Sequence, residues 1–227
     1  MTDTAELPEV AQNELRQRLI DTFSGTTLPP LLPVEKFLYE HFPTDVDFLR
    51  AVDIKDRRFR QAAVLIPVVD RADGLTVLLT KRADDMRNHP GQISFPGGVI
   101  EPQDVDAEAA ALRETHEEIG VLPSELTVLG YMPTLETFTG FSITPVIALV
   151  HADFTLVIEP REVAEVFEVP LEFFMQASNR QQGQREWAGR EVEYSLFKHS
   201  GHTIWGATSG LLSLFTNQLG AKHEGVR

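Results

Sequence analysis

The spacing of apolar residues changes several times along the chain, and the first regular pattern lies near the N-terminus. Between residues 9 and 23, apolar side chains recur at roughly helical intervals, which predicts an amphipathic helix. A stretch rich in glycine and proline over residues 24–33 predicts a linker, and a short helix is predicted over residues 34–41. The apolar positions of the first helix are Val10, Leu15, Leu19, Ile20 and Phe23.

A second set of patterns begins near Gln61 and is typical of a sheet. The continuous apolar run over residues 62–69 predicts a buried strand. A turn at residues 71–74 joins it to a second predicted strand over residues 75–80, so the two strands should form a hairpin. The elements predicted after this hairpin are helices over residues 104–119 and 207–219, and strands over residues 126–132, 144–150 and 191–197.

These elements divide the chain of 227 residues into two parts. We expect residues 1–57 to form an N-terminal helical extension and residues 58–227 to form the main domain. Strands mixed with few helices predict an α/β sandwich with a mixed β-sheet. The apolar stripe of the extension must pack against another surface, and contacts in a homodimer are one use that we expect for it.

Charge and composition narrow the classes of partner. Aspartate and glutamate number 34 against 20 lysines and arginines, which gives a formal net charge of −14 and argues against a nucleic-acid partner. An anionic substrate would therefore need divalent cations and a few placed arginines. The absence of cysteine excludes thiolate chemistry and fits a reducing cytoplasm. No signal peptide or membrane-spanning run is evident, so we expect a cytoplasmic protein without a membrane partner.

The predicted helix over residues 104–119 carries an unusual group of acids. At about 100° per residue, its core stripe places Glu114 and Glu118 at one edge, with Glu117 further round the same side. Asp104 or Asp106 can cap the start of this helix. The residues of the core stripe are Ala111, Leu112, Thr115 and Ile119.

This arrangement of carboxylates is unfavourable without a neighbouring positive charge. Two carboxylates about 5 Å apart repel each other by roughly 3 kcal/mol at an effective dielectric constant of about 20, and the C-terminal end of a helix favours cations. Arg113 can reach Glu117 at the i+4 position, but one arginine does not neutralise three acids. A divalent cation with oxygen ligands would, and Mg²⁺ or Mn²⁺ suits such ligands. The alternative is an acidic face in contact with solvent.

The acidic helix and the loop before it resemble the Nudix box of the Nudix hydrolases. Gly98 starts the box, and the run Arg113-Glu-Thr-His-Glu-Glu-Ile-Gly-Val121 ends it. Two departures lie in the first half, because Asp104 stands where the family has glutamate, and eight residues rather than seven separate it from Arg113. Thr115 also fills a position that is apolar in the family.

A second motif, just upstream, is similar to the signature of the coenzyme A pyrophosphatase branch of that family. It runs from Leu78 to Gly98, with Ala83 in place of the usual serine. Segments 139–146 and 204–210 are also similar to that branch, so the resemblance covers about residues 60–220. The matching residues of the signature are Leu78, Leu79, Thr80, Arg82, Arg87, Gly91, Phe95, Pro96, Gly97 and Gly98.

The resemblance implies a Nudix-type α/β/α sandwich and metal-dependent hydrolysis of a diphosphate linkage. For coenzyme A, the products would be 3′,5′-ADP and 4′-phosphopantetheine, or acyl-phosphopantetheine from an acyl derivative. By the same resemblance, Glu114 and Glu118 are the principal metal ligands, with Glu117 and the carbonyl of Gly97 assisting. Two alternatives stay open: hydrolysis of another nucleoside diphosphate derivative such as NADH or ADP-ribose, and a Nudix module that senses a ligand without catalysis.

Further residues are candidates for roles around this centre. The resemblance implies that Glu162 is a candidate general base, with Glu117 as its rival, and the competing interpretation of Glu162 is an exposed acid in a charged loop. Arg82 and Arg87 could donate to substrate phosphates or support the loop that carries them. His89 could contact the substrate or brace the same loop.

Overall fold

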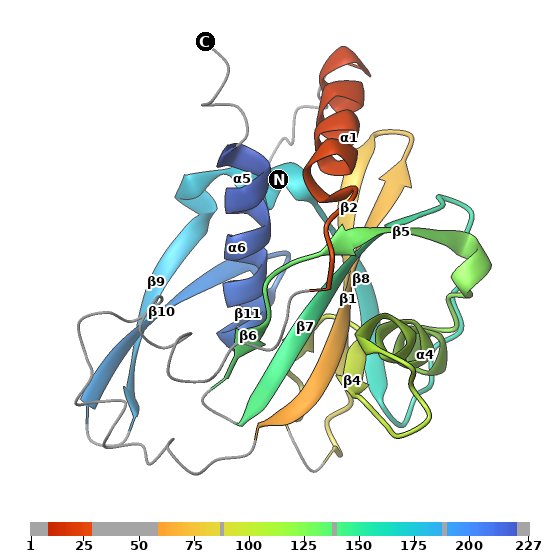
Figure 1. Ribbon diagram of the computed structural model, residues 1–227. Coiled ribbons are helices and arrows are strands. Elements are labelled where there is room, and N and C mark those ends of the chain that lie inside the picture. The colour runs from red at the N-terminus through yellow and green to blue at the C-terminus, as the bar shows by residue number, and fades with distance from the viewer. Residues whose placement is uncertain (1–8, 29–58, 87–88, 138–139, 188–189, 222–227) are drawn as a thin grey trace.

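The computed structural model describes residues 9–28, 59–86, 89–137, 140–187 and 190–221 (Figure 1). Its helices are α1 (Glu9–Phe23), α4 (Ala107–Ile119), α5 (Leu171–Met175) and α6 (Gly206–Ala221), with 3₁₀ turns η2 (Pro123–Glu125) and η3 (Ala177–Asn179). Its strands are β1 (Arg60–Arg71), β2 (Gly74–Arg82), β3 (Ile93–Ser94), β4 (Gly97–Val99), β5 (Leu126–Tyr131), β6 (Leu135–Glu136), β7 (Phe141–Val150), β8 (Val163–Pro170), β9 (Arg180–Trp187), β10 (Arg190–His199) and β11 (His202–Trp205).

The main sheet is mixed and is built around β1. Its path runs β3-β2-β1-β7-β5, while β4 pairs with β1, β6 with β7 and β8 with β2. The pairing of β1 with β7 is parallel, whereas β1 pairs with β2 and β4 in antiparallel fashion. Strand β4 pairs with residues 62–64 of β1, whereas β2 pairs with residues 68–71. The loop before α4 is therefore attached to the central strand of the sheet.

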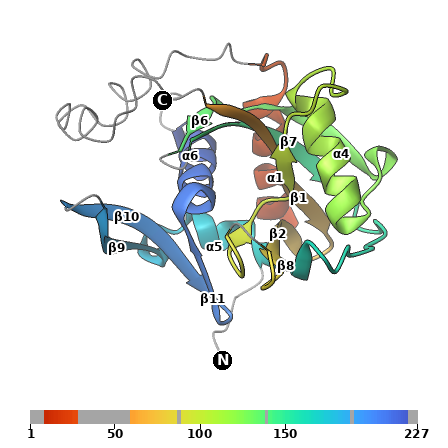
Figure 2. The same cartoon turned by 90° about the horizontal axis from the view of Figure 1, so that it is seen from below.

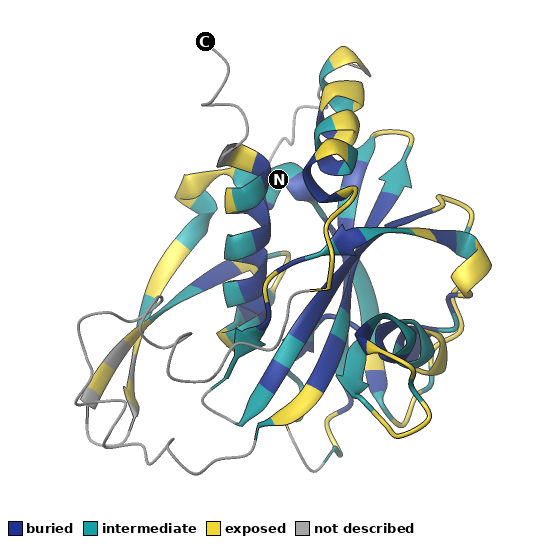
Figure 3. Cartoon of the chain, viewed as in Figure 1, coloured by how far each residue is buried: buried dark blue, intermediate teal, exposed yellow. Residues whose placement is uncertain are grey.

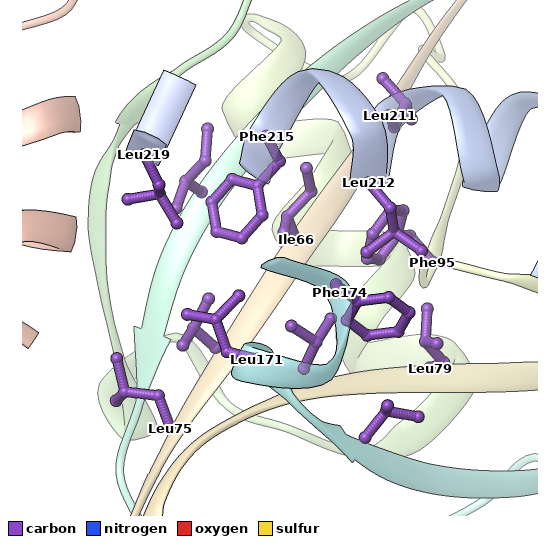
Figure 4. Packing of buried hydrophobic residues seen from close by; sticks show 14 of the residues in the cluster. Ile66, Leu75, Leu79, Phe95, Leu171, Phe174, Leu211, Leu212, Phe215 and Leu219 are labelled. Carbon is purple, nitrogen blue, oxygen red and sulfur yellow. The ribbon is translucent and has the colours of Figure 1, made fainter. Parts of the chain in front are cut away.

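Helices cover both faces of this sheet, as the predicted sandwich requires (Figure 2). Helix α4 packs on one face, where Ala63 and Leu65 of β1 share a core cluster with Ala110 and Ala111 of the helix. Helices α1, α5 and α6 pack on the other face, and in Figure 4 Phe174 and Phe215 lie around Ile66. Successive side chains of β1 point to opposite faces of the sheet, so this one strand contributes to the cores on both faces. Figure 3 shows the buried centre of the sheet.

Most predicted elements are present close to their expected bounds. Helix α1 coincides with the predicted range 9–23, and the hairpin turn falls between β1 and β2 as predicted. Helix α4 starts at Ala107 rather than at residue 104, because Asp106 caps it. The short helix predicted over residues 34–41 lies outside the described residues.

Helix α1 packs on the domain of its own chain. Leu15, Leu19 and Phe23 are buried in the same cluster as the sheet and α6, and the ring of Phe23 stacks on Phe215 at 5.4 Å. The expected use of the N-terminal segment in a homodimer stays a prediction. Among the described helices, none is long and apolar enough to span a membrane.

A second, three-stranded sheet was only partly predicted. Its order is β11-β10-β9, and sequence periodicity indicated only the middle strand. Strand β9 is rich in glutamine and charged residues and shows no alternation of apolar positions, so its pairing with β10 determines its structure.

Candidate active site

Helix α4 positions the acidic residues, and both of its ends are capped. The side chain of Asp106 accepts a hydrogen bond from the backbone N–H of Ala109 at 2.8 Å. At the other end Gly120 adopts a left-handed conformation with φ of 78°, and its N–H donates to the carbonyl of His116. Since both ends are fixed, the glutamates of the last two turns are held against the loop that contains β4.

Arg113 forms the centre of an ion-pair network on α4. Its guanidinium donates two hydrogen bonds to Asp104, each of 2.9 Å, and further bonds to Glu114 at 2.9 Å and Glu117 at 3.0 Å. The side chain of Asp104 is 4% exposed, and the hydrogen bonds from Arg113 lower the pKa of its carboxyl. Asp104 therefore fixes the orientation of Arg113, which in turn restrains two of the expected metal ligands.

We expect Arg113→Met to lower the free energy of unfolding by about 2 kcal/mol or more, because it leaves the buried carboxylate of Asp104 without its partner. The loss should appear above pH 3.8, the ordinary pKa of Asp104, and fade as pH falls through its lower folded value. Urea unfolding at pH 7 and pH 3 measures both effects. Arg161→Met, which breaks an ion pair whose arginine side chain is 86% exposed, is the matched control and should change stability little. Equal losses for the two variants would contradict the structural role of Arg113.

Glu118 is the most buried acid of the group. The residue is 3% exposed; its carboxylate accepts a hydrogen bond from the N–H of Gly97 at 3.2 Å and lies 3.9 Å from Nη1 of Arg82. Burial raises the pKa of Glu118 to about 8; Arg82 and the N–H of Gly97 oppose this rise, and the nearby carboxylates of Glu114 and Glu162 add to it. This carboxylate therefore lacks sufficient positive charge around it.

Glu114 lies against the glycine pair of β4. A Cβ atom added to Gly98 would lie 2.5 Å from Cδ of Glu114, so the absence of a side chain at Gly98 makes room for this carboxylate. Burial raises the pKa of Glu114, with Glu117 and Glu162 contributing, although Arg113 opposes the shift. Gly97 has φ of 149° and packs on the backbone of β1, which only glycine permits.

The fold brings Glu162 to the same place from a distant part of the sequence. Its charge acts on both Glu114 and Glu118, and its backbone carbonyl accepts a hydrogen bond from the N–H of Ala83 at 2.9 Å. Glu117, by contrast, has a side chain that is 54% exposed and is paired with Arg113. Of the two expected bases, Glu162 therefore lies near enough to affect both Glu114 and Glu118, whereas Glu117 lies at the outer edge and affects Glu114.

The three expected substrate contacts differ in position. Arg82 ends β2 beside Glu118, and its Nε is buried without a hydrogen-bond partner among the described residues. His89 is exposed, has φ of 56°, and its carbonyl accepts a hydrogen bond from the N–H of Gln92. Arg87 lies outside the described residues.

The charge distribution of the centre fits a divalent cation. Within the described part of the chain, no three acidic or histidine side chains converge as a ready-made cage. Glu118 nevertheless combines burial with a pKa raised to about 8, and Glu114 shares the direction of that shift. A cation between these hard oxygen ligands would offset the cost of their burial.

Two features of this site were not evident from the sequence. The bidentate pair of Arg113 with Asp104 depends on how the loop before α4 folds back, and the space that Gly98 leaves for Glu114 depends on the pairing of β4 with β1. In the sequence, only the unusual spacing between Asp104 and Arg113 pointed to their bidentate pair.

Comparisons with known proteins show which family the chain belongs to. A NUDIX domain family model matches residues 59–188, more than half of the chain. The Uncharacterized Nudix hydrolase NudL of Enterobacter sp. (strain 638) is 40% identical over 172 residues, covering 75% of this chain and 87% of that protein. The protein of the same name from Salmonella dublin is 35% identical over 195 residues, covering 84% and 100%.

Among solved structures, a C. elegans Ap4A hydrolase binary complex aligns with a TM-score of 0.48 at 17% identity, covering 73% of this chain and 99% of that one. The residues matched by the family model include the glycine pair, the acidic helix and the loop of Glu162 together. The chain therefore belongs to the Nudix hydrolase family, whose members act on nucleoside diphosphate derivatives and generally use divalent metal ions.

Proposed function

We propose that this Nudix hydrolase cleaves the diphosphate linkage of coenzyme A or its acyl derivatives. The products would be 3′,5′-ADP and 4′-phosphopantetheine or its acyl form. The half-buried carboxylate of Glu114 and the buried carboxylate of Glu118, beside the glycine pair, carry the hydrolytic part of this proposal, because they need a cation that a diphosphate can share. The resemblance of residues 78–98 to the coenzyme A pyrophosphatase signature supports the choice of substrate.

We assign the metal site to Glu114, Glu118 and Glu117, with the carbonyl of Gly97 as a further ligand. Mg²⁺ or Mn²⁺ suits this oxygen-rich set. When bound, such an ion would neutralise charge on the diphosphate and lower the pKa of the attacking water. Arg113 keeps Glu114 and Glu117 oriented through its hydrogen bonds, and Gly97 fixes the direction of the Glu118 carboxylate through its N–H.

The remaining residues of the site have roles in proton transfer and in positioning the substrate. We assign Glu162 to accept the proton of the water as its oxygen bonds to phosphorus and the bridging P–O bond breaks. That proton can then pass to the leaving phosphate. We assign Arg82 to donate to a phosphate oxygen, because its Nη1 lies 3.9 Å from Glu118 and its Nε has no hydrogen-bond partner in the described part of the chain. Arg87 and His89 belong to the same signature and are assigned to substrate binding on that ground.

Glu162→Gln should lower kcat about 10²-fold or more and leave KM nearly unchanged, because the amide keeps the shape but cannot take a proton. Glu117→Gln should reduce kcat less, since Glu117 lies at the outer edge and is paired with Arg113. Steady-state kinetics with saturating Mg²⁺ compares the two variants. A larger loss of kcat in Glu117→Gln than in Glu162→Gln would indicate that Glu117 is the base.

The choice of substrate is tested with purified full-length protein and either Mg²⁺ or Mn²⁺. Coenzyme A, acyl-coenzyme A, NADH, ADP-ribose and dinucleoside polyphosphates are supplied in parallel, and products are identified by mass. We expect the highest kcat/KM for a coenzyme A species. A preference for NADH or ADP-ribose would contradict the proposed substrate, and no turnover of any compound would contradict the hydrolytic function itself.

Two further aspects belong to the same proposal. We place the protein in the cytoplasm, which is consistent with a sequence that contains no cysteine. We also divide the chain into an N-terminal extension over residues 1–57 and a Nudix domain over residues 58–227, a boundary that lies next to the first matched residue, 59.

A further inference from the structure

Strands β6 and β7, with the residue before β6, carry a set of buried and half-buried polar side chains that the proposed chemistry does not use. These residues, which we call the polar strip, are Thr134, Glu136, Ser142 and Thr144. Three of them are almost fully buried: Thr134 and Ser142 are 5% exposed, and Thr144 is 4% exposed. Within the described residues, the hydroxyl oxygen of Thr134 and the Oε2 atom of Glu136 are buried without a hydrogen-bond partner.

Three members of the polar strip lie on the same face of the sheet as α4. Val146 and Ala148 of β7 belong to the core cluster under α4, and side chains at every second position of a strand share a face. Ser142 and Thr144 therefore point to this face. Glu136 is paired with Ser142 across the antiparallel strands, so it also points there.

The register of the strands connects the polar strip to the catalytic carboxylates. Gly98 is paired with Ala63, and Ala63 is paired with Thr144, so one row runs from β4 through β1 to β7. Figure 1 shows the same order of strands, with β6 next to β7. At about 4.8 Å between strands, Thr144 lies roughly 10 Å from Gly98, the residue that contacts Glu114.

Unpartnered polar groups at this depth are unusual. Buried polar atoms in folded proteins are nearly always hydrogen-bonded, because an unpaired one has lost its hydrogen bonds to water without replacement. Burial raises the pKa of Glu136, and no charged neighbour contributes to that shift. The free oxygens can therefore accept hydrogen bonds from a ligand that presents hydroxyl or amino groups at this face.

We propose that the polar strip binds the nucleoside part of the substrate, with Thr134 and Glu136 accepting hydrogen bonds from its hydroxyl or amino groups. This assignment rests on the proposed function, in which the diphosphate lies at Glu114 and Glu118. A nucleoside attached to that diphosphate extends away from it by a length comparable to the separation between Gly98 and the strip. Hydroxyl and carboxyl acceptors also match the donors that nucleosides carry.

The test compares two ligands that differ by the nucleoside alone. Binding of ADP and of inorganic pyrophosphate, each with Mg²⁺, is measured by calorimetry for wild-type protein and the variants Glu136→Ala and Thr134→Val. We expect each variant to weaken ADP binding about tenfold and to leave pyrophosphate binding unchanged. Glu136→Gln, which keeps one acceptor oxygen, should recover part of the loss. The matched control is Glu186→Ala, at an exposed residue of β9 in the second sheet, and should change neither affinity.

Equal losses for ADP and pyrophosphate, or no loss for either, would overturn the assignment. A rise in the KM for coenzyme A without weaker ADP binding would place the pantetheine arm at the strip and would overturn it as well. Thermal unfolding of each variant identifies any general loss of structure, in which case Glu136→Gln becomes the deciding variant. The inference and the proposed function fail separately: wild-type protein that binds ADP through the strip but does not hydrolyse coenzyme A contradicts only the proposed function.

Discussion

Replacing Glu118 with glutamine is expected to lower kcat on the order of 10³-fold, the largest loss that we predict for a single change of similar shape. A metal ion contributes several kcal/mol to the transition state of such a hydrolysis, and each 1.36 kcal/mol corresponds to a factor of about ten in rate. Glu118 is the buried ligand in our assignment, and its oxygens are directed by the N–H of Gly97. The amide keeps the volume of the side chain but removes the charge.

The same substitution should have the opposite effect on metal-free stability. Burial raises the pKa of Glu118 from an ordinary value of 4.5 to about 8, so the folded state holds this proton more tightly than the unfolded chain. The contribution of Glu118 to stability is therefore most favourable below pH 4.5 and is lost as pH rises from there through about 8. In EDTA at pH 8–9, Glu118→Gln should unfold at a higher temperature than the wild type.

Steady-state kinetics and thermal unfolding in EDTA measure these two effects on one preparation. The matched control is Glu172→Gln on α5, because burial also raises the pKa of Glu172, yet this residue lies on the opposite side of the sheet from α4. The control should retain wild-type kcat. Full activity of Glu118→Gln would contradict the metal site, whereas lost activity together with lost metal-free stability would indicate a structural role for the residue.

Gly97→Ala is expected to produce the largest loss of stability, about 3 kcal/mol or more. The new Cβ would lie 2.4 Å from the carbonyl oxygen of Ala63 and 2.6 Å from Cα of Val64, and both are backbone atoms of the central strand. The residue also has φ of 149°, which L-amino acids rarely adopt. Neither β1 nor β4 can move away without breaking the pairing that holds the site.

Gly98→Ala provides the contrast, because the two glycines are adjacent and meet different obstacles. Here the new Cβ would approach the carboxylate of Glu114 at 2.5–2.6 Å, and that side chain can rotate away. We expect stability close to wild type and kcat lowered about 10²-fold by the displaced ligand. Urea unfolding and steady-state kinetics are measured for Gly97→Ala and Gly98→Ala. Similar losses of stability in both variants would contradict the account that Gly97 permits the backbone packing while Gly98 makes room for the Glu114 side chain.

Local patterns predicted much of the fold. The apolar stripe of α1 and the caps of α4 are properties of contiguous residues, so the sequence was sufficient to locate these helices. Strands β3, β4 and β6 have only two or three residues each, too few for any periodicity. Their existence depends on the longer strands beside them, which a local pattern does not reveal.

The site was predictable where its residues share one helix, and less so elsewhere. The pitch of α4 alone indicated that Glu114 and Glu118 lie at the edge of the core and Glu117 further out, and the structure confirms this order. Arg82 and Glu162 reach the same centre through the pairing of β2 with β8, whose strands are far apart in the sequence. The resemblance to a known family suggested both residues, whereas the residue pattern did not.

The central claim is that Glu114 and Glu118 hold a divalent cation at the end of α4. It is tested most directly by anomalous diffraction from crystals of the full-length protein soaked in Mn²⁺, at a wavelength near the manganese absorption edge. We predict a peak within bonding distance of both carboxylates that disappears in Glu118→Gln. A map without manganese between them, with Arg82 or Arg113 occupying that space instead, would contradict the account.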